Sequence, residues 1–350
     1  MTRVTDAAPP LDGKIAWRVQ LQPPVTTPIV TDGRALYVAF PEAQKVVALS
    51  TDDGRELWSI ETTGQTDHAM ALAGNIVYVQ VRGGGLLALL TSTGATVWTG
   101  PGDRALTATP TIVDGVLWAG MRGRLVAFDA ETGDILGEST IGSRFVRLRP
   151  AVDARHVTVA KTDTLLIFDS TTAERTFQAR FPGLQYVAIT GDTVLAVSDR
   201  QLVAFNANAR LPPWDGVRDW WFRLHLYLGL PDVPTPPNLW VQQTGCEVLA
   251  PVVDSARVMV ACAKGAIRAF DLETGEMLWE RTGAPIATAP VLTADRLLVA
   301  DSATLVLLDP ASGRELRRRT LDAEIEVSEI LVTEEGIYIL TPTYELIAVR

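Results

Sequence analysis

Apolar and polar residues alternate along this chain in short runs separated by Asp, Gly and Asn, a pattern typical of β-strands joined by tight turns. The clearest example is Ala269 to Trp279, AFDLETGEMLW, in which a turn from Asp271 to Gly275 separates two strands. The Asp side chain can accept backbone N–H bonds inside such a turn, and the Gly can adopt the positive φ that closes it. This stretch therefore predicts a β-hairpin.

The predicted hairpin recurs along the chain about every 40 residues, with one longer gap after Ala204. A second hairpin, with a Pro or small residue before its first strand, precedes each copy. Each period therefore predicts four short strands. The copies are Ala48 to Trp58, Ala88 to Trp98, Ala127 to Gly137, Ile167 to Phe177, Ala204 to Trp214, Ala269 to Trp279 and Leu307 to Arg317.

The two ends of the chain complete one repeat between them. An eighth unit begins near Ile330 and ends at Arg350 without its last strand, whereas Lys14 to Leu21 is a strand that carries Trp17. A ring closed in this way leaves no open sheet edge between its first and last blades. The sequence predicts an all-β fold, an eight-bladed β-propeller of four-stranded antiparallel blades over residues 14–350, after a loose lead-in over residues 1–13.

Composition agrees with a large globular core and limits the partners. The chain has 350 residues, 47% of them hydrophobic, and a formal net charge of −10. An acidic surface disfavours nonspecific binding to nucleic acid or anionic lipid. The polar, Pro-containing lead-in is either the natural start or what remains after an export segment. We expect an extracytoplasmic protein in the second case and a cytoplasmic one in the first.

The two cysteines, Cys246 and Cys262, flank the first hairpin of the sixth unit. A turn centred on Asp254 would bring them face to face. A turn one residue later, which the repeat alignment favours, offsets them by two or three residues and disfavours disulfide geometry. A disulfide and two buried thiols are therefore both open interpretations. The three histidines lie far apart and predict no metal site.

The repeated motif resembles that of the quinoprotein-like propellers, approximately A-x-D-x-x-T-G-x-x-x-W, over nearly the whole chain. In that family the Trp packs between neighbouring blades and its indole N–H reaches a backbone carbonyl. The resemblance implies this docking position for five residues, and differently packed seams where Gly137, Phe177 and Arg317 replace Trp. The five residues are Trp17, Trp58, Trp98, Trp214 and Trp279.

The same family contains enzymes and non-enzymes. Its dehydrogenases hold pyrroloquinoline quinone and calcium on the ring axis, with adjacent cysteines against the quinone, whereas BamB-like lipoproteins are scaffolds in outer-membrane assembly. This chain has no adjacent cysteines, and it lacks nucleophile-elbow, P-loop and zinc-protease motifs. We therefore expect no catalytic residue, cofactor or metal. A quinone-dependent dehydrogenase or another small-ligand-binding propeller is the alternative.

One segment, at about residues 215–245, is not explained by the repeat. It is rich in large apolar groups interrupted by arginines, and a helix there would present one aromatic face. The segment is either a lid that packs on the propeller or an element that docks a protein partner or a membrane surface. Its candidate contact residues are Arg218, Trp220, Trp221, Phe222, Arg223, Leu224, Tyr227 and Trp240.

A second candidate surface is the mouth of the ring. Arg144, Arg147 and Arg149 precede the fourth unit, while acidic residues crowd the eighth, so opposite sides of the ring should carry opposite charge. These ends are either solvated or form a polarised docking face. The sequence thus predicts a non-catalytic scaffold for protein–protein interaction in a cell-envelope complex.

Overall fold

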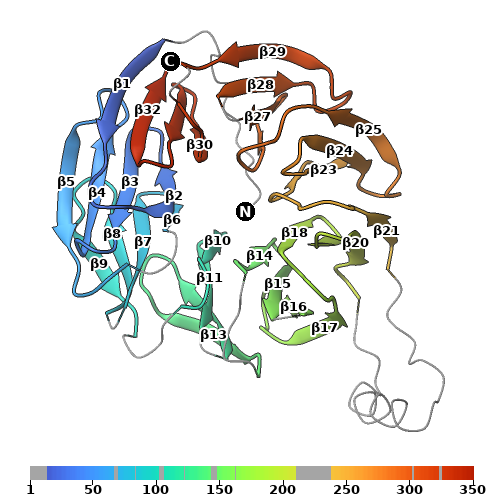
Figure 1. Cartoon of the computed structure of the whole chain (residues 1–350). Helices are drawn as coiled ribbons and strands as arrows, with labels where there is room; N and C mark the ends of the chain where they lie inside the picture. The colour runs from blue at the N-terminus through green and yellow to red at the C-terminus, as the bar shows by residue number, and fades with distance from the viewer. Residues whose placement is uncertain are drawn as a thin grey trace.

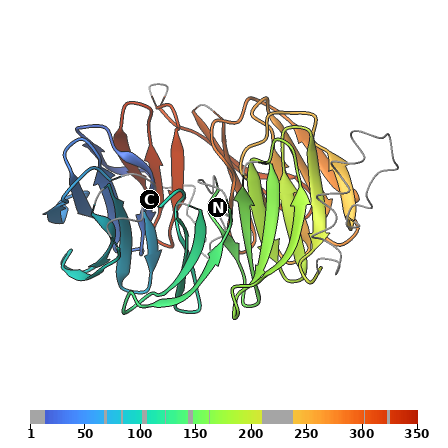
Figure 2. The ribbon, with the colours of Figure 1, turned by 90° about the horizontal axis from the view of Figure 1, so that it is seen from below.

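A computed structural model describes residues 14–66, 70–82, 84–101, 106–121, 123–142, 148–161, 163–209, 238–301, 303–322 and 325–350. These residues form eight sheets of four antiparallel strands, arranged as blades around a central axis (Figure 1). Figure 2 views the same ring from its side. The predicted eight-bladed β-propeller is confirmed.

Each blade runs from an innermost strand at the axis to an outermost strand at the rim. Blade 1 holds β2 (Thr26–Thr31), β3 (Ala35–Phe40), β4 (Lys45–Ser50) and β5 (Glu56–Glu61); blade 2 holds β6 (Ala71–Ala73), β7 (Ile76–Val81), β8 (Gly85–Leu90) and β9 (Thr96–Thr99); blade 3 holds β10 (Thr111–Val113), β11 (Val116–Met121), β12 (Arg124–Asp129) and β13 (Ile135–Thr140); blade 4 holds β14 (Ala151–Val152), β15 (His156–Lys161), β16 (Thr164–Asp169) and β17 (Arg175–Arg180).

The second half of the ring repeats this order. Blade 5 holds β18 (Tyr186–Thr190), β19 (Thr193–Val197), β20 (Gln201–Asn206) and β21 (Trp240–Gln243); blade 6 holds β22 (Val252–Val253), β23 (Arg257–Ala261), β24 (Ala266–Asp271) and β25 (Met277–Thr282); blade 7 holds β26 (Val291–Leu292), β27 (Leu297–Asp301), β28 (Thr304–Leu308) and β29 (Glu315–Thr320); blade 8 holds β30 (Glu329–Val332), β31 (Ile337–Leu340), β32 (Glu345–Val349) and, at the rim, β1 (Ile15–Gln20).

The ring is closed by its own termini, as the sequence pattern predicts. Strand β1 pairs with β32, with Arg18 opposite Ile347 and Val19 opposite Leu346. The side chain of the last residue, Arg350, then crosses to blade 1 and donates to the carbonyl of Thr51 at 2.9 Å. Blade 8 is therefore built from both ends of the chain and is tied to its neighbour.

The hydrophobic core lies in the seams between blades. Eight clusters of buried residues are present, and each combines residues from two adjacent blades. Alternating strand residues face the two neighbouring blades, so every blade is buried on both sides. The core is thus a ring around the axis, and the axis itself is left for a cavity.

Trp–Gly contacts join five of the seams. In the seam between blades 1 and 2, the indole N–H of Trp58 donates to the carbonyl of Thr91 at 2.7 Å. Its ring lies against Gly94, where an added Cβ would stand 2.6 Å from ring atom Cε3. Gly is also required there because its φ is +71°. The other pairs are Trp17 with Gly54, Trp98 with Gly133, Trp240 with Gly275 and Trp279 with Gly313.

Seams without Trp are packed differently. Gly137 stands at the docking position of blade 3, and the turn it faces in blade 4 carries Ala173 in place of Gly, at a φ of +57°. Phe177, at the docking position of blade 4, is buried and its ring lies 5.9 Å from that of Phe205. The loss of the indole therefore goes together with a change in the residue opposite.

Blade 5 corrects the predicted docking position. The repeat spacing assigns it to Trp214, which lies outside the described residues, but the structure gives it to Trp240. Trp240 pairs with Ala204 in the sheet and its indole donates to the carbonyl of Leu272 at 2.9 Å. At 8% exposure it is a buried seam residue rather than a docking contact. The insertion thus interrupts the turn of the repeat and ends before β21, not at residue 245.

The cysteines form a disulfide, which the predicted strand offset disfavours. The offset itself is present: Val248, not Cys246, bridges to Cys262. The two Cα atoms are nevertheless 5.8 Å apart and the sulfurs are bonded. Residues 244–247 lie outside any strand, and Gly245 turns the chain with a φ of +63°. An irregular segment can thus reach across where a regular strand could not.

Candidate functional site

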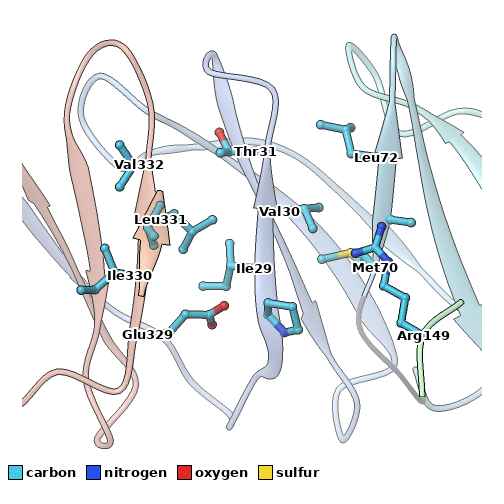
Figure 3. Close-up of a pocket in the computed structure, with 13 residues that line it drawn as sticks. Ile29, Val30, Thr31, Met70, Leu72, Arg149, Glu329, Ile330, Leu331 and Val332 are labelled. Atoms are coloured by element: carbon cyan, nitrogen blue, oxygen red, sulfur yellow. The ribbon is translucent and has the colours of Figure 1, made fainter. Parts of the chain in front are cut away.

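The innermost strands surround a cavity of about 400 Å³ on the axis of the ring. Its wall consists of residues 28–31 on β2, residues 70–72 at β6 and residues 329–332 on β30, together with Val291 and Arg149 (Figure 3). A second cavity of about 200 Å³ shares Arg149 and is lined by the start of β10, by β14 and by β18. Arg149 therefore stands where the two spaces meet.

Arg149 is held in place by the residues around it. It precedes Pro150, and its Nε donates to the hydroxyl of Thr111 at 2.8 Å. That hydroxyl donates in turn to the carbonyl of Pro150 at 2.5 Å. Within the described part of the chain, Thr111 is its one hydrogen-bond partner and no carboxylate forms an ion pair with it. Burial lowers the pKa of the Arg149 guanidinium, which still stays charged at neutral pH.

The repeat shows that Arg149 is a departure from the pattern. In other blades the residue before the Pro that opens the innermost strand is small and uncharged: Thr27, Thr109, Ala250 and Ala289 occupy this place. Nothing in the β-structure of the blade requires a guanidinium there, because these residues serve equivalent strands. The charge is therefore available for a role other than folding.

A carboxylate lines the same cavity. Glu329 begins β30, takes the place of the opening Pro in blade 8, and is 5% exposed. In Figure 3 it and Arg149 approach the cavity from different blades, on either side of β2. Of the arginines and acids predicted to polarise the ring, Arg149 and Glu329 are the pair that the structure brings to the axis. Arg144 and Arg147 lie outside the described residues.

The remaining candidate contacts lie outside the described residues, within residues 210–237. They are Arg218, Trp220, Trp221, Phe222, Arg223, Leu224 and Tyr227.

An exposed apolar face on blade 5 is absent from the sequence-based candidates. Leu239 and Val241, two residues apart at β21, are 49% and 42% exposed. Val241 directly follows the docking Trp, a position that is polar in every other blade. Its counterparts there are Arg18, Ser59, Thr99, Glu138, Gln178, Glu280 and Arg318. This departure could have been found from the sequence only by placing Trp240 correctly first.

The described lining of the axial cavity does not match the needs of a calcium-bound quinone cofactor. Pyrroloquinoline quinone is a polycarboxylate, which requires several cationic or donor groups, and calcium requires several oxygen ligands. The described lining supplies one guanidinium and one carboxylate among apolar side chains. Across the described residues, no three His, Cys, Asp or Glu side chains converge as a metal site. We therefore derive no chemistry through this cofactor.

Among the residues with a described structure, no helix combines the length and the apolar character needed to cross a membrane.

Comparison with solved structures gives the same architecture. BamB from Moraxella catarrhalis matches with a TM-score of 0.65 and 17% sequence identity, covering 96% of this chain and 97% of that one. The computationally designed Ika8 protein matches with a TM-score of 0.75 and 15% identity, covering 96% and 99%. At these identities the likeness shows the fold. No curated protein matched the chain.

The closed ring of four-stranded blades with its Trp–Gly seams defines a quinoprotein-like repeat propeller. The model of one family matches residues 1–210, 122–283 and 234–336, so that most of the chain is included. The chain belongs to the family described as outer membrane protein assembly factor BamB.

Proposed function

We propose that this chain is a non-catalytic scaffold that binds a partner protein in an extracytoplasmic compartment of the cell envelope. The family description as an assembly factor supports the scaffold role. The Cys246–Cys262 disulfide supports the compartment, because disulfides persist in oxidising surroundings such as the periplasm and are rare in the cytosol. The disulfide supports this location independently of family likeness.

The observation that carries the proposal is the outer face of β21. An outermost strand has an unpaired edge, and proteins usually protect such edges with charged residues. β21 and β9 are the two rim strands without a charged residue, and β9 has Thr99 where β21 has Val241. β21 thus combines an edge without charged residues with the exposed aliphatic side chain of Val241, and Leu239, just before the strand, is exposed as well.

The partner that fits this edge is an extended, uncharged strand of another protein. Such a strand can extend the sheet of blade 5 through backbone hydrogen bonds, while the aliphatic side chains select its apolar residues. A charged strand would gain no ion pair at β21 and would lose hydration. We therefore expect the partner segment to alternate apolar and neutral polar residues.

The test compares Val241→Glu with Ser59→Glu. Both substitutions add a carboxylate directly after a docking Trp on a rim strand, but on different blades. Both sites are solvent-accessible, so each should change stability by no more than about 0.5 kcal/mol. Partners should be captured from native envelope extract and identified by mass spectrometry, and hydrogen exchange at the β21 amides should then be measured with each purified partner.

The expected result is a partner that protects the β21 amides and is lost with Val241→Glu but kept with Ser59→Glu. Equal capture of every partner by the two variants would contradict the proposal. A partner that binds without slowing exchange at β21 would also contradict it.

A further inference from the structure

We propose that the axial cavity binds a small apolar monocarboxylate, whose carboxylate pairs with Arg149 and whose apolar body lies along β2, β6 and β30. This site is separate from the β21 edge, which lies at the rim of the ring, so either proposal can fail without the other.

Within the described residues, the charge of the Arg149 guanidinium has no counter-ion. A partly buried cation without a counter-ion is costly to keep in a folded protein. Its Nε is used by Thr111, and the two terminal nitrogens have no partner within the described part of the chain. A guanidinium in this state presents parallel N–H groups that match the two oxygens of a carboxylate. An anion at this place would therefore relieve a cost that the free protein carries.

The wall of the larger cavity is mostly apolar. Ile29, Met70 and Ile330 are buried aliphatic or thioether side chains from three different blades, and all three line it. A volume of about 400 Å³ suffices for a small molecule. A strongly hydrated ion such as sulfate or phosphate would leave these groups without contacts. The ligand should therefore have a hydrocarbon body attached to its charge.

The position of Glu329 limits the ligand to one carboxylate. Glu329 lines the same cavity, so a second carboxylate placed along β30 would stand beside the carboxyl oxygens of that residue. This arrangement also disfavours polycarboxylate cofactors. The chemical class is thus a monocarboxylate of medium chain length or a compact aromatic acid.

The test uses decanoate, the neutral analogue decanol and the dicarboxylate sebacate as probes, each measured by titration calorimetry with the full-length protein. Decanoate should bind at least about tenfold more tightly than decanol, because a charge-assisted hydrogen bond to Arg149 is lost in the alcohol. It should also bind more tightly than sebacate. Equal affinity for decanoate and decanol would overturn the proposal, and tight sebacate binding would contradict the role given to Glu329.

Two variants and a control locate the site. Arg149→Gln should weaken decanoate binding by about tenfold or more, whereas Arg175→Gln, which removes an exposed charge from the rim of the same blade, should leave it unchanged. Leu72→Trp should fill the larger cavity and block decanoate while Arg149 stays in place. Circular dichroism checks the fold of each variant. Unchanged binding in Arg149→Gln, or in a folded Leu72→Trp, would overturn the proposal, as would no binding by the natural protein.

Discussion

Replacing Gly94 by Ala should loosen the seam between blades 1 and 2. The new Cβ would stand 2.6 Å from Cε3 of Trp58 and 2.9 Å from a methyl group of Ile60. Ordinary contacts between such atoms are at about 3.5–4.0 Å, so the indole would have to withdraw by about 1 Å. The backbone would also have to hold Ala at a φ of +71°.

The cost can be estimated from three contributions. A residue with a Cβ at positive φ costs about 1 kcal/mol relative to Gly. Moving the indole endangers the hydrogen bond from Trp58 to the carbonyl of Thr91, which is worth about 1 kcal/mol. Partial loss of the ring's packing adds about 1 kcal/mol, since full burial of a large side chain contributes about 1.5–3 kcal/mol. We expect Gly94→Ala to destabilise the protein by about 3 kcal/mol.

A double-mutant cycle with Trp58→Ala separates these contributions. Without the indole, Gly94→Ala should cost only the conformational part, about 1 kcal/mol, which leaves a coupling of about 2 kcal/mol. Ala173→Gly is the matched control, because Ala173 occupies the same turn position at a φ of +57° but faces Gly137 instead of Trp. It should change stability by less than about 1 kcal/mol.

The assay is urea unfolding followed by far-UV circular dichroism, with hydrogen exchange to locate the change. Exchange should rise in β4, β5 and the turn that contains Gly94, and not in blades 5 to 7. A cost below about 1 kcal/mol for Gly94→Ala, or additive effects of the two substitutions, would refute the view that Gly is present to make room for the indole.

Two further predictions concern the acid and redox behaviour of the protein. Hydrogen bonds within the turns lower the pKa of three carboxyl groups. The main donor is the Thr132 amide for Asp129, the Thr274 amide for Asp271 and the Ser312 hydroxyl for Asp309. The stabilisation from these bonds is present above the unfolded-state pKa of about 4 and is lost as pH falls through the lower folded-state pKa. The urea midpoint should therefore fall below about pH 4, and replacing all three by Asn should flatten that fall. Reducing the Cys246–Cys262 disulfide, which joins residues 16 apart, should destabilise the protein by about 3 kcal/mol. The measurement compares thermal unfolding with and without reductant, and an unchanged transition would contradict the prediction.

Most of the architecture could be predicted because one physical unit repeats. Each copy needs an apolar strand end, an Asp that accepts turn amides, a Gly at positive φ and a ring for the seam, so its period is visible even where single positions change. Closure by β1 could be predicted because the strand that carries Trp17 is the last strand of a repeat, and the other three strands of that repeat are at the end of the chain. These are local and periodic requirements, and sequence displays them directly.

The insertion in blade 5 could not be placed correctly from the same spacing. Trp214 stands at the usual distance from Ala204, although the residue that pairs with Ala204 in the sheet is Trp240. What distinguishes them is the sequence that follows: Trp214 precedes Asp and Gly, whereas Trp240 precedes the strand-like Val-Gln-Gln-Thr. The disulfide was obscured for a related reason, because strand offsets do not apply to an irregular segment such as the one that carries Cys246.

Departures from the repeat fall into two kinds, and the difference between them separates structure from function. At the seam between blades 3 and 4, the docking position holds Gly137 in place of Trp, and the turn position opposite holds Ala173 in place of Gly. The two residues face each other, so each change accommodates the other. Arg149 and Val241 show no such compensating change. Within the described residues no carboxylate pairs with Arg149, and the Val241 side chain is exposed to solvent. A departure that costs stability without a matching change nearby needs another reason to persist, and binding supplies one in both places.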